Sequence, residues 1–356
     1  MKALIAMSGG VDSSVAALLM KQAGYECTGA TMRLFDKDNG MVASDACGGN
    51  KDVEDARAIA TSLGMDYKVI DYVADFKEKI IDLFIRTYEQ GGTPNPCIDC
   101  NRLMKFDKLV EAGREMGCDC VATGHYARVG FDETLGRYVL RKALDDSKDQ
   151  SYVLYTLTQR QLEMARFPLG EMTKAHARDI AEEYGFSNAR KHDSQDICFV
   201  PDGDYAGFIE RTTGKKYVEG DFVTPDGEVL GRHKGIIHYT IGQRKGLGIS
   251  STAPLFVVDV DAENNEVVLT HGDGLFKKTV IAGDVNLIAY EHLDAPLRCS
   301  ARIRYKHKEQ PCTVEQIGDT LQIVFDEPQR APTRGQSVVL YDGDLVIGGG
   351  KIINSY

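Results

Sequence analysis

Residues 8–14 read Ser-Gly-Gly-Val-Asp-Ser-Ser, and this stretch decides the fold of the first part of the chain. The apolar run 3–7 before it predicts a strand, and the Ala- and Leu-rich run 15–20 after it predicts a helix. Two adjacent glycines let backbone N–H groups approach an anion, and the serine hydroxyls and the helix start add donors. The stretch therefore predicts a phosphate-binding loop, with an ordinary strand-to-helix turn as the alternative. No Walker-type Gly-x-x-x-x-Gly-Lys-Ser/Thr sequence occurs in the chain.

Strand and helix patterns alternate from this loop to about residue 203, and beyond it the helical signal fades into short β runs. Alternation of this kind predicts right-handed crossovers and a parallel sheet with ligands at the carboxyl ends of its strands. We therefore expect an α/β fold with a doubly wound parallel sheet, followed by a small β-rich domain and a C-terminal β-barrel. The expected bounds are 1–205, 206–275 and 276–356. Residues 128–140 have the pattern of a β-hairpin.

Composition sets further limits on the function. Hydrophobic residues make up 43% of the 356 residues, which excludes a disordered protein. No apolar run approaches the roughly 20 residues of a membrane span, and no signal-peptide pattern is present, so we expect a cytoplasmic protein with no membrane contact. The net charge of -11 argues against nonspecific coating of nucleic acid but permits a local basic footprint.

Nine cysteines in such a chain favour thiol, metal or redox chemistry over a disulfide framework. The stretch 93–101 holds Cys97-x-x-Cys100 between two prolines and Asn101, which predicts a stiff loop with Asn101 capping the next helix. This pair fits half a zinc site, a redox pair or two cluster ligands; structural zinc needs two more ligands, and no second C-x-x-C exists. Cys198 is a third cysteine of interest. The others are interpreted as small, partly buried hydrophobic residues: Cys27, Cys47, Cys118, Cys120, Cys299 and Cys312.

A run near the C-terminus places basic side chains at every second position. On a strand these would share one face, and four like charges in line favour a polyanion opposite them. A solvated strand face is the alternative. The residues of this face are Arg298, Ser300, Arg302, Arg304, Lys306 and Lys308. Arg244 and Lys245 fit an exposed turn or a base or phosphate contact equally well.

Several motifs, taken together, resemble one family. They are the loop, Thr93-Pro94-Asn95-Pro96, Cys100-Asn101, Gly124-His125, Lys148-Asp149-Gln150, Asp196-Ile197-Cys198-Phe199, residues 239–248 and residues 302–305. The loop resembles the pyrophosphatase loop (PP-loop) of ATP-dependent adenylating enzymes with an adenine nucleotide α-hydrolase-like fold. The whole chain resembles the bacterial tRNA-specific 2-thiouridylases.

This resemblance implies the reaction of a tRNA-uridine 2-sulfurtransferase (EC 2.8.1.13). In it, ATP adenylates the C2 oxygen of the wobble uridine (U34) of tRNA, pyrophosphate leaves, and sulfur then displaces AMP. The implied cofactors are ATP and Mg²⁺, with Asp12 placed to share the metal. The implied partners are tRNAs with anticodons of the Lys, Glu and Gln type and an upstream sulfur donor or persulfide relay protein.

The same resemblance assigns site residues. ATP contacts are implied at Ala6, Met7, Ser8, Gly9, Gly10, Val11, Asp12, Ser13, Met32 and Gly124. Target-base contacts are implied at Asn95, Pro96 and Cys97, and tRNA contacts at His125, Lys148, Asp149, Gln150, Arg304, Tyr305 and Gln336. Cys100 is implied as the nucleophile and Cys198 as the persulfide carrier. Taken alone, His125 fits a core histidine as well as an RNA contact.

Cys97 departs from the family pattern, in which many members carry Asp at this position. A third thiol makes this chain similar to members interpreted as binding a [4Fe-4S] cluster through three thiolates, here Cys97, Cys100 and Cys198. One iron would then stay open for hydrosulfide. The cluster route and the persulfide route, which leaves a Cys100/Cys198 disulfide, both stay open, with a slight preference for the cluster.

Two other functions are compatible with parts of the sequence. An ATP-dependent ligase of the argininosuccinate or GMP synthetase type explains the loop but not the three cysteines. A noncatalytic RNA-binding or redox-sensing protein is opposed by the intact Ser8, Asp12 and Ser13.

Overall fold

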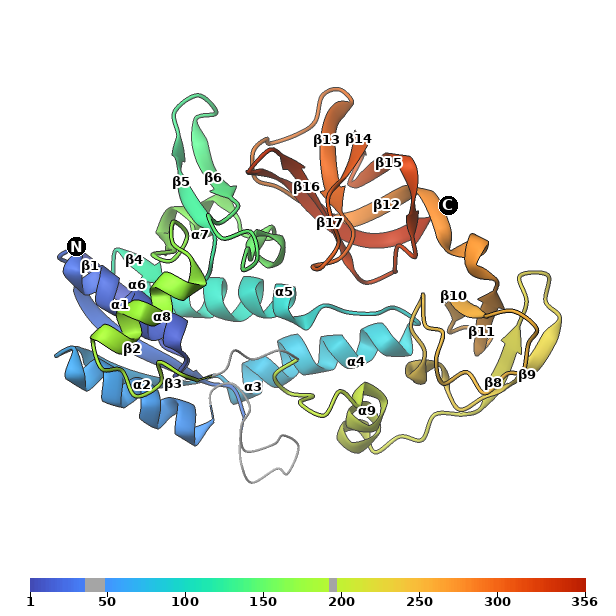
Figure 1. Cartoon of the computed structure of the whole chain (residues 1–356), viewed down its shortest axis with the longest axis horizontal. Coiled ribbons are helices and arrows are strands. Elements are labelled where there is room, and N and C mark those ends of the chain that lie inside the picture. Colours follow the sequence, from blue (N-terminus) through green and yellow to red (C-terminus); the bar gives the residue numbers. More distant parts are fainter. Residues whose placement is uncertain (36–48, 192–196) are drawn as a thin grey trace. The chain divides into compact units, whose positions relative to one another are not determined.

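The computed structural model describes residues 1–35, 49–191 and 197–356 (Figure 1). The described chain divides into two compact units. Unit 1 comprises Met1–Ile80, Cys97–Gly203 and Gly343–Val346, and unit 2 comprises Ile81–Pro96, Asp204–Asp342 and Ile347–Tyr356. Within the described residues, no helix has both the length and the hydropathy that crossing a membrane requires.

Unit 1 is built on a five-stranded sheet with the order β3-β2-β1-β4-β7, and all of its pairings are parallel. Its strands are β1 (Lys2–Ala6), β2 (Glu26–Arg33), β3 (Asp66–Asp71), β4 (Cys120–Ala122) and β7 (Ala165–Arg166). The strand order reverses between β1 and β4, so the crevice at their carboxyl ends is the place where such sheets bind ligands. The loop 8–10 begins at this point.

Helices cover both faces of the sheet (Figure 1), and successive residues of β1 pack against different helices. Ala3 and Ile5 pack in one cluster with residues of α1 (Val11–Gln22), α2 (Asn50–Ser62) and α8 (Lys174–Glu183). Leu4 points to the other face, where it packs with Leu109 and Val110 of α6 (Leu109–Glu115). Strand residues alternate between faces, so this division shows that the sheet is buried on both sides. The predicted doubly wound α/β fold is confirmed.

The remaining elements of unit 1 include the predicted hairpin, formed by β5 (Arg128–Asp132) and β6 (Arg137–Arg141). The other helical segments are α3 (Val73–Phe76), the π-helical Lys77–Ile81 and Asn101–Lys108, a 3-10 turn at Ser151–Leu154 and α7 (Gln159–Met164). Helix α5 (Pro96–Cys100) crosses a unit boundary, because it begins at the last residue of a unit 2 segment, whereas α4 (Asp82–Glu89) lies within unit 2.

Unit 2 contains α9 (Tyr205–Thr213), a four-stranded sheet and a six-stranded barrel. The sheet, ordered β10-β11-β8-β9, consists of β8 (Gly220–Val223), β9 (Val229–His233), β10 (Phe256–Asp261) and β11 (Glu266–Thr270). The barrel strands are β12 (Phe276–Leu287), β13 (Leu297–Arg302), β14 (Gln310–Ile317), β15 (Thr320–Arg330), β16 (Ser337–Asp342) and β17 (Leu345–Ser355). Pairing of β12 with β17 closes the barrel. The predicted β-rich region and C-terminal barrel are confirmed.

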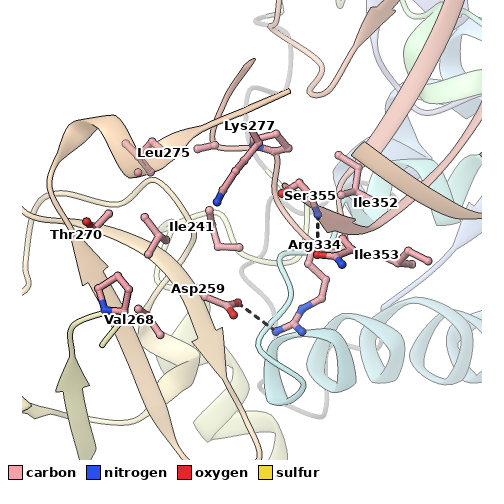
Figure 2. Close-up of a pocket in the computed structure, with 16 residues that line it drawn as sticks. Ile241, Asp259, Val268, Thr270, Leu275, Lys277, Arg334, Ile352, Ile353 and Ser355 are labelled. Carbon is pink, nitrogen blue, oxygen red and sulfur yellow. Dashed lines mark hydrogen bonds and ion pairs between the residues drawn. The ribbon is translucent and has the colours of Figure 1, made fainter. Parts of the chain in front are cut away.

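Unit 2 also holds a cavity of about 320 Å³, shown in Figure 2. Apolar side chains such as Ile241, Val268 and Leu275 line it, and Lys277 and Arg334 add positive charge. The Arg334 guanidinium donates to the Val260 carbonyl at 2.8 Å and lies 3.8 Å from the Asp259 carboxylate. No residue of the predicted phosphate-binding loop lines this cavity.

Candidate phosphate-binding loop and cysteine sites

The predicted loop turns directly from β1 into α1, with Gly10 as the N-cap. Gly9 has a φ of +71°, and a Cβ there would lie 2.5 Å from the Asp52 carbonyl oxygen, so only glycine fits. The Ser13 hydroxyl accepts from the Ser8 N–H at 3.2 Å and donates to the Gly10 carbonyl at 3.0 Å. The Ser14 hydroxyl also donates to Gly10, at 3.0 Å. The serines therefore fix the shape of the loop before any ligand is bound.

Asp12, in the first turn of α1, is held by two residues from elsewhere in unit 1. Lys174 Nζ lies 2.8 Å from both carboxylate oxygens of Asp12, and the Tyr126 hydroxyl donates to one of them at 2.8 Å. The Lys174 side chain is only 10% exposed. A buried lysine needs a negative partner, and Asp12 is that partner. The two charges beside the loop therefore neutralise each other. Lys174 is a member of the site that the sequence analysis missed.

Gly124, which follows β4, packs against the same helix turn. A Cβ at Gly124 would lie 2.8 Å from the backbone of both Asp12 and Ser13. The structure therefore brings Gly124 together with the loop, as predicted. Met7 and Val11 are 2% and 3% exposed, so any ligand contact at these two positions would involve their backbone.

Asn188 and Lys191, which were not predicted from the sequence, also contact the loop. The Asn188 amide nitrogen donates to the Gly9 carbonyl at 3.0 Å and to the Ser14 hydroxyl at 2.9 Å. Lys191 Nζ donates to the same Gly9 carbonyl at 3.2 Å. Nothing in the local sequence marks these two residues, because Asn188 is 179 positions from Gly9 and meets it only through the fold.

Mg²⁺, which the resemblance implies beside Asp12, would find the carboxylate of that residue here. Among the described residues, no group of three or more His, Cys, Asp or Glu side chains is arranged to hold a metal. Mg²⁺ keeps several waters and often takes most of its other ligands from substrate phosphates, so one carboxylate is compatible with it. The Asp12 side chain is 30% exposed, and Mg²⁺ there would share the carboxylate with Lys174 or displace it.

The segment with Cys97 and Cys100 differs from the prediction of an irregular loop. Helix α5 begins at Pro96 and runs directly into the π-helical segment Asn101–Lys108. Proline is compatible with the first turn of a helix, which explains why it does not prevent regular structure. Asn101 is therefore not an N-cap; it is 2% exposed inside the helix and donates to the Val153 carbonyl at 3.0 Å.

The helical geometry decides how these two cysteines are presented. Cys97 is exposed and Cys100 is half-buried. Residues three apart on a helix are neighbours on its surface, with Cβ atoms about 5–6 Å apart. Cys97 and Cys100 therefore share one helix face.

Cys198 is half-buried in the turn beside Phe199, whose ring packs on Phe76 at a centroid distance of 5.9 Å. Asp196 of the same motif lies outside the described residues, as does Cys47. In the part of unit 1 that is described, Cys97, Cys100 and Cys198 do not form a metal-binding group. A [4Fe-4S] cluster held by these three thiols therefore stays a prediction, as does the persulfide route.

Among the predicted tRNA contacts of unit 1, His125 is a core residue. It is 7% exposed and packs against the rings of Phe106 and Phe167. Its Nδ1 lies 2.7 Å from the Thr123 hydroxyl, and burial, with a smaller contribution from Lys105, lowers the pKa of His125 well below its usual value. His125 is therefore neutral in this conformation.

In the motif Lys148-Asp149-Gln150, the side chains of Asp149 and Gln150 form hydrogen bonds within unit 1. Asp149 is buried and accepts from the N–H groups of Ala143 and Ser151. Gln150 accepts from the Tyr126 N–H through its side chain, and its own N–H donates to the Tyr126 carbonyl. These contacts position Tyr126, the partner of Asp12. Lys148 is half-buried.

In unit 2, two of the predicted contact residues bind the protein itself. The Gln336 side-chain nitrogen donates to the carbonyls of Thr93 and Pro94 at 2.9 and 3.2 Å, which fixes the segment before Asn95 and Pro96. Arg304 donates to the carbonyl of Ala331 at 2.8 Å. Tyr305, by contrast, is 38% exposed.

The predicted basic face is only partly present. Strand β13 ends at Arg302, so Lys306 and Lys308, which are exposed, lie beyond it. Arg302 forms an ion pair with Glu309 at 2.7 Å, and Arg298 forms one with Asp326. The repulsion that favoured a polyanion is relieved at Arg298 and Arg302, because both have carboxylate partners within unit 2. The predicted alternation within β13 is confirmed, since Ala301 is fully buried.

Cys299 and Cys312 lie opposite each other on neighbouring barrel strands. They are directly paired across β13 and β14, with their sulfur atoms 3.7 Å apart. Cys312 is buried in the barrel core, which agrees with its interpretation as a small hydrophobic residue.

The comparisons with known proteins extend over the same regions. Three family models match: the tRNA methyl transferase HUP domain over residues 1–202, the tRNA methyl transferase PRC-barrel domain over 206–271 and the aminomethyltransferase beta-barrel domain over 277–352. The tRNA-specific 2-thiouridylase MnmA of Clostridioides difficile (strain 630) is 52% identical over 99% of this chain and 98% of its own length. The chain belongs to the tRNA-specific 2-thiouridylase family.

Other 2-thiouridylases show the same full-length likeness. The protein of this name from Lachnoclostridium phytofermentans is 48% identical over 99% of both chains. One from Caldanaerobacter subterraneus subsp. tengcongensis, named MnmA 2, is 50% identical over 99% of this chain and 97% of its own length. The match therefore includes the loop, both cysteine segments and the barrel.

Proposed function

We propose that this chain is a tRNA-uridine 2-sulfurtransferase, which uses ATP to replace the C2 oxygen of the wobble uridine of tRNA with sulfur. The observation that carries this proposal is the 52% identity to a 2-thiouridylase over essentially the whole of both chains. The preformed loop after β1 supports it, because a reaction that releases pyrophosphate needs such an anion site. The ligase and noncatalytic alternatives leave this full-length match unexplained.

The loop and Asp12 serve the first step. Backbone N–H groups at the start of α1 face developing negative charge on the phosphates, while the hydroxyls of Ser8 and Ser13 hold the shape of the loop. Asp12 holds Lys174 and is the carboxylate of this chain that would hold Mg²⁺, which supplies further charge neutralisation when bound. Adenylation turns the C2 oxygen into part of a good leaving group, AMP.

Cys100 and Cys198 serve the second step by the persulfide route. A Cys198 persulfide supplies the outer sulfur to C2 of the adenylated uridine, and AMP leaves. Cys100 then attacks the sulfur of Cys198, the bond between that sulfur and the outer sulfur breaks, the outer sulfur stays on C2 as the thiocarbonyl, and a Cys100/Cys198 disulfide remains for reduction. The alternative is the cluster route, in which Cys97, Cys100 and Cys198 would hold a [4Fe-4S] cluster. Cys97, exposed on the same helix as Cys100, borders the target base.

The remaining parts of the chain serve the tRNA. We assign residues 1–205 to ATP binding and catalysis, 206–275 to a central β-rich domain and 276–356 to a tRNA-binding barrel. Tyr305, Lys306 and Lys308, whose side chains are exposed, contact RNA. Asn95 and Pro96 contact the base. The substrates are tRNAs with anticodons of the Lys, Glu and Gln type, and an upstream persulfide protein supplies the sulfur.

Purified protein tests this function directly. It is incubated with unmodified tRNA, ATP, Mg²⁺ and a persulfide donor, and the nucleosides are analysed by mass spectrometry. We expect 2-thiouridine at position 34, dependent on ATP. Formation of a new amide or guanidinium product from small substrates, with no thionucleoside, would instead show a ligase.

A further inference from the structure

The carbonyl of Gly9 is held by two side chains from the segment that leads to Cys198. Asn188 donates to it at 3.0 Å and Lys191 at 3.2 Å. The peptide unit is planar and trans, so the N–H of Gly10 points opposite to this carbonyl. The two side chains therefore direct the Gly10 N–H away from themselves and set the orientation of the central peptide of the loop.

Lys191 is suited to this role because its charge is already balanced. Its Nζ lies 2.7 Å from Asp52 and 2.9 Å from Asp55, both in the first turns of α2. The carbonyl of Asp52 is also the atom that excludes a side chain at Gly9. Lys191 thus joins α2 to the loop, in contrast to its neighbour Arg190, whose side chain is 90% exposed.

Asn188 contributes through its nitrogen. The residue is 4% exposed, and its amide also donates to the Ser14 hydroxyl. Within the described residues, the Asn188 Oδ1 atom has no hydrogen-bond donor. A buried acceptor without a donor is destabilising. The amide keeps this orientation because both of its hydrogens are used at the loop.

We propose that Asn188 and Lys191 are positioning residues for the phosphate site. They hold the Gly9–Gly10 peptide so that its N–H faces the ATP phosphates, and they join the loop to the chain segment that carries the sulfur-transferring Cys198. This inference rests on the proposed function, since it takes ATP as the ligand of the loop.

The test replaces each side chain with one of similar size. Asn188→Asp puts an oxygen where the donor nitrogen was, facing the Gly9 carbonyl, and Lys191→Met removes the charged donor but keeps the length. Lys191→Arg restores a donor, and Arg190→Met is the matched control. The Lys191 side chain is 32% exposed, so we expect its variants to fold. They test the inference even if Asn188→Asp does not fold. Binding of ATP with Mg²⁺ is measured by calorimetry, and tRNA-dependent pyrophosphate release and tRNA affinity are measured separately.

We expect Asn188→Asp and Lys191→Met to weaken ATP binding about tenfold and to slow pyrophosphate release by on the order of 10²-fold, because misplacement of about 1 Å has such an effect. The affinity for tRNA stays at the parent value, Lys191→Arg recovers part of the loss, and Arg190→Met behaves as the parent. Parent-like ATP binding and pyrophosphate release in both variants would overturn the inference. Failure of the parent protein itself to bind ATP would overturn the proposed function instead.

Discussion

Lys174 Nζ lies 2.8 Å from both carboxylate oxygens of Asp12, at the start of the helix that follows the phosphate-binding loop. The lysine comes from the first residue of α8, and its side chain is 10% exposed. The loop sequence contains no basic residue, so Lys174, like Lys191 at the Gly9 carbonyl, brings positive charge to the loop from a distant part of the chain. The pair places one negative and one positive group beside the loop within unit 1.

Asp12→Asn keeps the shape of the side chain but removes its charge. We expect the fold and the tRNA affinity to be retained, while adenylation slows by about 10²–10³-fold, the usual effect of losing one preorganised electrostatic group. Rapid-quench measurement of pyrophosphate release checks this. An unchanged rate would remove Asp12 from the reaction.

Lys174→Met tests the positively charged member of the Asp12–Lys174 ion pair. The methionine fills a similar volume, but the Asp12 carboxylate loses its cation, and the phosphates lose a positive neighbour. We expect a higher KM for ATP and slower adenylation, again by about 10²-fold. Lys68→Met, which removes an exposed lysine of the same unit, is the control. Equal kinetics in the two variants would mean that Lys174 serves stability alone.

Substitution of single cysteines distinguishes the persulfide route from the cluster route. With a persulfide donor and iron-free conditions, we expect Cys100→Ser and Cys198→Ser each to abolish thiolation while leaving adenylation intact. Cys97→Ser should retain measurable thiolation, and Cys118→Ser, which alters another half-buried thiol, should match the parent. If Cys97→Ser is inactive and the parent requires about four bound irons per chain, the cluster route is correct and the persulfide route is wrong.

Salt dependence distinguishes the basic residues of unit 2. Lys306→Gln and Lys308→Gln should each flatten the log–log dependence of tRNA affinity on salt by about 0.7–0.9 of a unit, the value for one phosphate contact. A double variant with the parent slope would show that neither lysine contacts RNA.

Arg302→Gln should act on stability. It breaks the ion pair with Glu309, in which the two side chains are 18% and 22% exposed. We expect thermal unfolding to show a loss of about 1–3 kcal/mol, typical of hydrogen bonds to charged groups, with little change in the salt slope. A flattened slope with unchanged stability would instead place Arg302 on the RNA.

The parts of the fold that were predicted from sequence depend on short-range patterns. The double glycine at 9 and 10 and the alternation of apolar runs predicted the loop, the parallel sheet and the barrel. Pro96 was misleading, because proline ends a helix when it lies inside one but is compatible with its first turn. The sequence pattern alone does not distinguish these two positions.

The residues missed at the site are those that reach it across the fold. Lys174 and Asn188 are separated from their loop partners by 162 and 174 positions, and no local motif marks such pairs. Glu309, the partner of Arg302, is only seven residues away in sequence. The two side chains meet because β13 ends at Arg302 and the chain then turns back. A pattern of basic residues at every second position does not show where the strand ends.

The central claim is that ATP activates the uracil C2 oxygen of the tRNA, and trapping of the adenylated intermediate tests it most directly. The protein is incubated with ATP labelled at the α-phosphate and unmodified tRNA, with no sulfur donor, and label on the RNA is measured. We predict up to one AMP per tRNA, attached at uridine 34, with none on a tRNA that carries cytidine there, and none with Asp12→Asn on the same timescale. Absence of label on uridine 34 under conditions where the parent protein binds both ATP and tRNA would contradict the account.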